Sequence, residues 1–151
     1  MKEIEPHEQL TTYSCGSAAL TVAYRALGIE CNEANILVEL ETGKNGVEWV
    51  NLVNHASNMG FPIELKLRAT YKDIQKDFKR GVIITGFNTN CMGELFSHAC
   101  VVSGVLDDYI ELTDPGQPEE DWPTIMTRED FIANWAVNGE AQGYLLIKPK
   151  T

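Results

Sequence analysis

Cys15 is the residue of this sequence whose type and position best suit nucleophilic chemistry. It is followed by Gly16, at the start of an apolar stripe that predicts a helix over residues 15–27. The first N–H groups of a helix lack internal partners and its dipole is positive there, and both features favour the reactive thiolate. Gly16 has no side chain, so a substrate backbone could approach closely. A buried structural cysteine beside a helix-packing glycine is the alternative explanation.

His98 is the candidate base that such a nucleophile needs. Acyl transfer to the thiolate also needs an acid that protonates the leaving amine, and one imidazole can serve both purposes. His98 opens an apolar strand that continues through residues 99–102. The other two histidines suit this role less well, because His7 lies in the N-terminal tail and His55 lies mid-helix without an evident orienting partner. A histidine that only packs beside a strand is the alternative.

Asp114 is the candidate orienting group for His98. Two predicted strands, 98–105 and 109–113, are joined by an Asp-Asp turn and should pair as a hairpin. Since His98 and Asp114 then lie at the same end of the hairpin, the two side chains should come close. Asp114 could accept from one ring nitrogen and leave the other facing the thiol. The Asp-Pro-Gly sequence at 114–116 is also a turn signal in its own right.

A glutamine and three further residues complete the candidate site. Gln9 precedes Cys15 by six residues. Its side-chain amide can donate to a developing oxyanion together with the backbone N–H of Cys15. Taken alone, a glutamine in a loop carries no such information. We also expect three small residues close to the catalytic candidates in the sequence to contact the substrate: Gly16, Ser14 and Ser97.

The elements that would position these residues divide into a helical first half and a strand-rich second half. Helices are predicted over residues 15–27, 33–40, 47–59, 70–79 and 127–137, with a turn at 43–46. Potential N-cap residues precede four of them: Ser14, Asn32, Thr70 and Thr127. Strands are predicted over 61–67, 82–87, 98–105, 109–113 and 144–147, with a polar loop at 88–97. Helices first and strands later predict an α+β fold with an antiparallel sheet.

Length and charge exclude several classes of protein. The 151 residues suit a single domain spanning 1–151. The net charge of -10, with no basic stripe, argues against binding to nucleic acid. No apolar run approaches the roughly 18 residues that span a bilayer, and the N-terminus lacks the features of a secretory signal. The oligomeric state is left open by the sequence.

The four cysteines form no CxxC pair and no dense framework. They indicate free thiols in a reducing compartment, so we expect a cytoplasmic location. The spacing of His98 and Cys100 also differs from that of structural zinc sites. We therefore expect no metal and no other cofactor.

The combined pattern resembles the double-glycine leader peptidases, papain-like cysteine peptidases of bacteriocin processing. The shared elements are Gln9-x5-Cys15-Gly16-x-Ala18-x-Leu20, His98-x2-Val101-Val102 and Asp114-Pro115, and the similarity extends from about Gln9 to Ile147. The resemblance implies a papain-like fold, with an N-terminal helical lobe carrying Cys15 and a C-terminal antiparallel β-sheet lobe carrying His98 and Asp114. It also implies cleavage after a Gly-Gly pair in a leader peptide. The position after the family's histidine is usually aromatic and is Ala99 here, which leaves the peptide substrate open.

The predicted function is that of a cysteine peptidase acting on a peptide or protein through a thioester intermediate. The same residues could instead catalyse deamidation or acyl transfer, because the thioester accepts different nucleophiles. A non-catalytic peptide-binding module is the third possibility. Such a module would often have lost one of the four candidate residues, and all four are present here.

Overall fold

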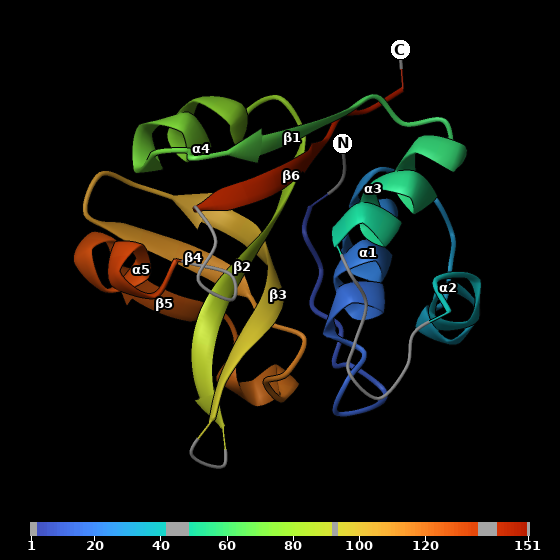
Figure 1. Ribbon diagram of the computed structural model, residues 1–151, viewed down its shortest axis with the longest axis horizontal. Helices are drawn as coiled ribbons and strands as arrows, with labels where there is room; N and C mark the ends of the chain where they lie inside the picture. The colour runs from blue at the N-terminus through green and yellow to red at the C-terminus, as the bar shows by residue number, and fades with distance from the viewer. Residues whose placement is uncertain (1–2, 42–48, 92–93, 136–141, 151) are drawn as a thin grey trace.

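The chain folds into a layered structure of helices and one sheet (Figure 1). The computed structural model describes residues 3–41, 49–91, 94–135 and 142–150, and within the strands it describes 87–91 and 94–97 by their backbone alone. The helices are α1 (Cys15–Ala26), α2 (Glu33–Glu39), α3 (Trp49–Asn58), α4 (Tyr71–Asp77), α5 (Arg128–Asn134) and the short 3-10 helix η1 (Glu119–Asp121). The strands are β1 (Ile63–Leu67), β2 (Val82–Cys91), β3 (Glu94–Val105), β4 (Tyr109–Thr113), β5 (Thr124–Thr127) and β6 (Gly143–Ile147).

The six strands form one sheet in the order β1-β6-β2-β3-β4-β5. Every neighbouring pair is antiparallel. The predicted α+β architecture with an antiparallel sheet is therefore confirmed. Among the described residues, no helix combines the length and the apolar character needed to cross a bilayer.

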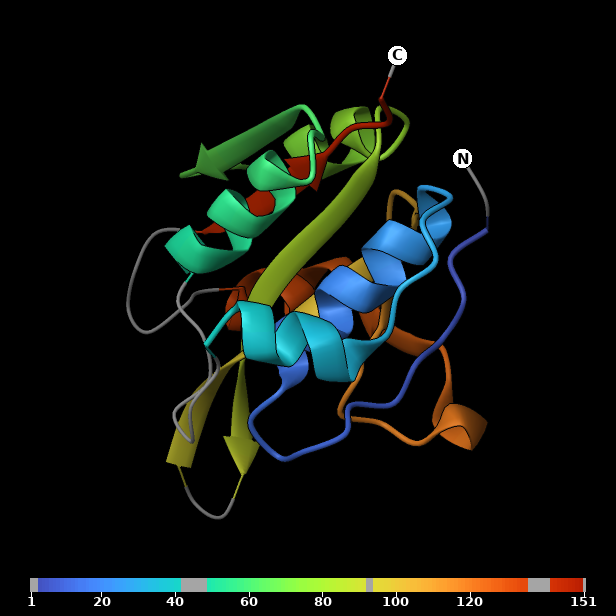
Figure 2. The same ribbon diagram turned by 90° about the vertical axis from the view of Figure 1, so that its right-hand side faces the viewer.

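Helices α1, α2 and α3 cover one face of the sheet, and α4 and α5 cover the other (Figures 1 and 2). Side chains alternate along the central strands, so that Val82 and Ile84 pack toward α1–α3 and Ile83 packs toward α4 and α5. Each such buried side chain contributes about 1.5–3 kcal/mol to folding. Burial on both faces explains why these strands have continuous apolar runs in the sequence.

Three of the predicted helix caps are confirmed. The side chains of Asn32, Thr70 and Thr127 each accept a hydrogen bond from the backbone N–H three residues later. At Thr70 the bond is reciprocated, because the Asp73 carboxylate accepts from the Thr70 N–H. Each cap satisfies N–H groups that a helix start leaves without partners.

The predicted side-chain cap at Ser14 is wrong. Ser14 precedes α1, but its hydroxyl makes no capping bond. It accepts instead from the Thr11 N–H at 3.0 Å and donates to the Thr11 carbonyl at 3.2 Å. The hydroxyl therefore holds the preceding loop, and it does not occupy the N–H groups at the start of α1.

The sheet differs from the prediction in three places. Within the segment predicted as a polar loop, residues 88–91 and 94–97 continue the β2–β3 hairpin, with Asn88 opposite Ser97 and Cys91 opposite Glu94. Backbone pairing does not depend on apolar side chains, so polarity alone is a poor signal for a loop. Strand β5 and helix η1 are additional elements that the sequence analysis did not predict, and β6 lies between β1 and β2.

The edge strand β1 also departs from its sequence pattern. Its alternating residues Leu65 and Leu67 remain largely exposed, because β1 has only β6 as a neighbour and forms an edge of the sheet. The predicted turn at 43–46, the start of the third predicted helix at 47–48 and the end of the last at 136–137 lie outside the described residues.

Candidate active site

Cys15 is the first residue of α1, and its half-buried side chain packs against the core between the helices and the sheet. Burial raises the pKa of this thiol. The hydrogen bond from His98, the charge of that ring and the backbone N–H groups of Ala99 and Gly16 outweigh burial and lower the pKa below its ordinary value of 9.0. Donors from the start of α1 and from β3 therefore lower the pKa of the thiol together. A lowered pKa favours the thiolate, which is the form that acts as a nucleophile.

The β3–β4 hairpin brings His98 and Asp114 together. Val101 pairs with Thr113, and a register shift between Val102 and Gly104 accommodates one extra residue on β3. His98 Nε2 hydrogen bonds to Asp114 Oδ1, as the predicted hairpin geometry requires. Burial of the His98 ring lowers its pKa, but Asp114, Cys100 and Cys15 together raise it above the ordinary 6.5. The ring therefore favours the charged form that stabilises a thiolate beside it.

Two residues that the sequence reasoning missed hold Asp114 in place. The Gly116 N–H donates to Asp114 Oδ1 at 2.8 Å, and the indole Nε1 of Trp122 donates to the Asp114 carbonyl at 3.1 Å. A Cβ atom at Gly116 would lie 3.0 Å from His98 Cε1. A glycine leaves room there for the imidazole ring, which closely approaches the backbone. The Asp-Pro-Gly sequence signalled the turn, but not this contact.

Cys100 is a second thiol beside His98. It is fully buried in the core on the α4–α5 side of the sheet. Burial raises the pKa of Cys100 to about 12 despite the hydrogen bond from His98. The donor atoms of His98, Cys100 and Asp114 lie within 4.8 Å of one another. These three side chains could hold a soft divalent cation, although here the His98 ring interacts with the other two.

Gln9 lies against the loop that carries Asp114. Its backbone N–H donates to the Pro115 carbonyl at 2.8 Å, and its side-chain Nε2 donates to the Thr11 carbonyl at 2.6 Å. Its Oε1 is buried and has no partner among the residues that the structure describes. A primary amide nitrogen carries two hydrogens, so Nε2 keeps one for another acceptor.

The three expected substrate-contact residues lie in different environments. Ser14 and Gly16 are both buried, the first bonded to Thr11 and the second donating its N–H toward Cys15. The backbone of Ser97 pairs with Asn88, and its side chain lies outside the described residues. A contact of these residues with substrate stays a prediction.

His55 is bonded elsewhere in the molecule. The sequence offered no orienting partner for it, but its Nδ1 lies 2.7 Å from the Tyr24 hydroxyl and its Nε2 lies 2.5 Å from Glu39 Oε2. These contacts tie α1, α2 and α3 together. His55 therefore helps to hold the three helices together. His98 is the histidine that contacts Cys15.

Solved structures share this arrangement of elements. The peptidase domain of Streptococcus ComA, a bi-functional ABC transporter of a quorum-sensing pathway, matches with a TM-score of 0.80 at 20% identity, over 98% of this chain and 100% of that chain. A double glycine motif protease from an AMS/PCAT transporter, in complex with the leader peptide, matches with a TM-score of 0.75 at 18% identity, over 99% and 95% of the two chains. These matches confirm the papain-like fold.

Sequence similarity leads to the same family. A curated relative, an uncharacterized protein of Methanothermobacter thermautotrophicus, is 26% identical over 107 residues, which are 71% of this chain and 68% of that protein. The model of the Peptidase C39 family matches residues 4–148. Since that match covers nearly the whole sequence, and the resemblance to double-glycine leader peptidases is confirmed with it, this chain belongs to the Peptidase C39 family of cysteine peptidases.

Proposed function

We propose that Cys15, His98 and Asp114 form the catalytic triad of this peptidase, with Gln9 in the oxyanion hole. One observation supports the assignment above all others: His98 hydrogen bonds to both the Cys15 thiol and the Asp114 carboxylate. A thiol, an imidazole and a carboxylate in this order are what thiol-based acyl transfer requires.

In the first step the Cys15 thiolate attacks the carbonyl carbon of the scissile peptide bond. The carbonyl oxygen becomes an oxyanion that accepts from the Cys15 N–H and from the second Nε2 hydrogen of Gln9. A donor of this kind typically accelerates the reaction about 10²–10³-fold, because the charge that it binds develops only in the transition state.

His98 then transfers its proton to the leaving nitrogen, the C–N bond breaks, and a thioester remains on Cys15. The neutral imidazole next takes a proton from water, whose oxygen attacks the thioester carbon. Collapse of this second intermediate releases the carboxylic acid product and restores the thiolate beside a charged His98. Asp114 holds the ring orientation in both steps and stabilises its charge.

For the substrate we propose a leader peptide cleaved after Gly-Gly. The related double glycine motif protease that was solved with its leader peptide supports this choice. We place the reaction in one peptidase domain spanning residues 1–151, which the family match over 4–148 supports. The free thiols Cys15, Cys31 and Cys100 support a reducing, cytoplasmic compartment.

Synthetic leader peptides test the proposal. Peptides with an intact Gly-Gly pair, and matched peptides with Val-Val there, are incubated with the protein, and the products are identified by mass spectrometry. We expect cleavage after Gly-Gly alone, lost in Cys15→Ala and kept in Cys31→Ala, whose thiol lies away from His98. Products that carry a converted glutamine side chain, or an added amine, would instead identify a deamidase or an acyl-transferase.

A further inference from the structure

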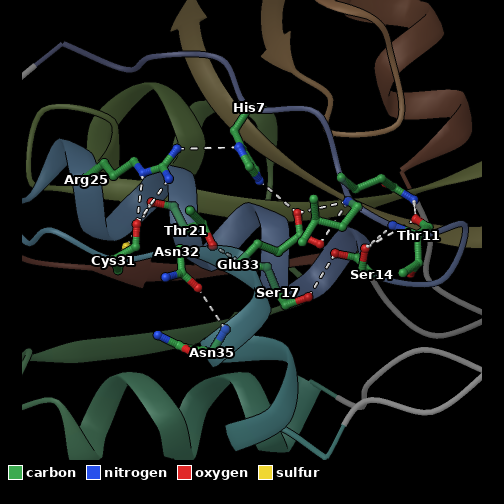
Figure 3. A network of polar contacts seen from close by, with 12 residues as sticks. His7, Thr11, Ser14, Ser17, Thr21, Arg25, Cys31, Asn32, Glu33 and Asn35 are labelled. Atoms are coloured by element: carbon green, nitrogen blue, oxygen red, sulfur yellow. Dashed lines mark hydrogen bonds and ion pairs between the residues drawn. The ribbon is translucent and has the colours of Figure 1, made fainter.

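A buried carboxylate anchors the segment that carries Gln9. Glu33 is the first residue of α2, yet only 1% of it is exposed. A buried carboxylate is costly unless donors satisfy it. Figure 3 shows its side chain reaching from α2 toward the N-terminal segment, where His7 and the residues up to Thr11 run past α1.

Both oxygens of Glu33 accept hydrogen bonds from this segment. His7 Nε2 donates to Oε1 at 2.8 Å. The Leu10 N–H lies 2.9 Å from Oε2 and 3.2 Å from Oε1. Bonds to an ionised acceptor are roughly twice as strong as neutral ones. One side chain of α2 therefore binds the segment on both sides of Gln9.

The His7 ring is held from its other side by α1. Arg25 has no acceptor, so the 3.4 Å contact between its Nη1 and His7 Nδ1 requires Nδ1 to accept. The hydrogen on Nε2 then donates to Glu33. Arg25 also donates to the Cys31 carbonyl at 3.1 and 3.3 Å, in the connection between α1 and α2. The anchoring network thus belongs entirely to the helical layer (Figure 3).

Gln9 links this network to the sheet layer. Its own N–H donates to the Pro115 carbonyl, next to Asp114, while the adjacent Leu10 N–H donates to Glu33. Two successive backbone N–H groups are therefore bound by opposite layers of the molecule. This fixes the backbone of Gln9 relative to both Cys15, on α1, and Asp114.

We infer that Glu33 is a positioning residue for the oxyanion donor: its carboxylate sets the position of Gln9 and thereby the rate of the chemical step. The inference rests on the proposed role of Gln9. Glu33 touches none of the proposed reacting groups, and it acts through the 7–10 segment. The Glu33→Gln side chain has the same shape but only one acceptor oxygen. Its NH2 group must therefore face one of the donors, His7 Nε2 or the Leu10 N–H.

The first test is hydrogen exchange at the Leu10 amide in Glu33→Gln, measured by NMR. We expect exchange at least about tenfold faster than in the parent, because the N–H loses its charged acceptor. Glu39→Gln is the matched control, since Glu39 also accepts from a histidine Nε2 but lies away from Gln9. Unchanged exchange at Leu10 in Glu33→Gln overturns the inference, whether or not a peptide substrate is known.

The second test separates positioning from general stability. With a cleaved peptide, Glu33→Gln should lower kcat about 10–100-fold and change KM little, because the oxyanion forms only after binding. Alkylation of Cys15 by iodoacetamide forms no oxyanion, and its rate should stay within about twofold of the parent. A parallel loss of alkylation indicates a disturbed fold and counts against the inference.

A double-mutant cycle decides whether Glu33 acts through Gln9. If it does, Glu33→Gln should add little to the loss already caused by Gln9→Ala. Independent, multiplicative losses overturn the inference while leaving the proposed function intact. A parent protein that cleaves no peptide but shows the fast Leu10 exchange in Glu33→Gln refutes the proposed function and leaves the anchoring role of Glu33 standing.

Discussion

Two cysteines lie beside His98, Cys15 in the core on one side of the sheet and Cys100 in the core on the other. The two thiols differ in burial and in pKa. Cys15 comes from α1 on one face, is half-buried and has a lowered pKa. Cys100 comes from β3 within the opposite core, is fully buried and has a pKa raised to about 12. Both thiols lie beside the same imidazole, which lowers the pKa of each.

The difference therefore cannot come from the histidine. Cys15 also receives backbone N–H groups from Gly16, at the start of α1, and from Ala99. For Cys100, desolvation outweighs the help from His98, and the nearby Asp114 charge raises its pKa further. Burial and backbone donors decide which of two neighbouring thiols becomes a nucleophile.

The largest expected effect separates the two thiols by activity. Cys15→Ala should reduce peptide turnover by about 10⁴-fold or more, because the proposed thioester forms on the Cys15 thiol. Turnover is measured by mass spectrometry on a cleaved leader peptide. Retention of activity in Cys15→Ala would contradict the assignment and would point to Cys100.

The second-largest effect removes the Asp114 charge that stabilises the imidazolium beside Cys15. Asp114→Asn should lower kcat by about 10³-fold, since the amide neither stabilises the imidazolium nor fixes its tautomer. Stopped-flow or discontinuous peptide assays measure the loss. Asp121→Asn, an exposed acidic residue of η1, is the control and should leave kcat unchanged.

The comparison also predicts a difference in labelling. At pH 7 iodoacetamide should modify Cys15 at least about 100-fold faster than Cys100, because only the thiolate reacts. The thiolate of Cys15 forms as the pH rises through its lowered pKa, so the inflection of its labelling rate should lie below pH 9. His98→Ala should shift that inflection to higher pH. Peptide mapping identifies the labelled cysteine, and equal rates would refute the comparison.

A smaller effect concerns the ring that lies between the thiols. In Gly116→Ala the new Cβ would lie 3.0 Å from His98 Cε1, so the ring must move by a few tenths of an ångström. We expect kcat to fall about tenfold, as small misplacements of catalytic groups are costly. Ala34→Gly, at an exposed position of α2, is the control and should leave kcat unchanged. Gly28→Ala would not serve, because Gly28 has a positive φ.

The smallest expected effect is that of Cys100 itself. Cys100→Ala should leave turnover within about threefold of the parent and lower the free energy of unfolding by about 1 kcal/mol, from the small cavity that it leaves. Urea unfolding measures the second quantity. A loss of turnover comparable to that of Cys15→Ala would show that Cys100 takes part in the chemistry.

The sequence predicted the catalytic candidates from local signals. Cys15 was identified from its position at a helix start. His98 and Asp114 were identified because a hairpin places residues at the ends of its two strands close together. The contact between His98 and Asp114 followed from the lengths of two strands and a short turn. Asn32, Thr70 and Thr127 were likewise predictable, because a cap involves only residues three apart.

Other features depended on contacts between distant segments. The Ser14 hydroxyl hydrogen bonds to Thr11 instead of capping α1, and residues 88–91 and 94–97 pair in the β2–β3 hairpin. Gly116 beside His98 and Trp122 beside Asp114 carried no signal in their own neighbourhoods. Sequence periodicity depends on residues that are neighbours along the chain, whereas these contacts join residues of different segments.

By itself, then, the sequence determined which residues could do chemistry and which elements would carry them, because those properties arise from neighbours along the chain. The tertiary structure alone decided that Cys100 is fully buried with a raised pKa beside Cys15, and that Glu33 binds the segment of Gln9. Both outcomes depend on burial and on donors supplied by other elements. Desolvation and hydrogen-bond satisfaction are defined only once the layers have packed together.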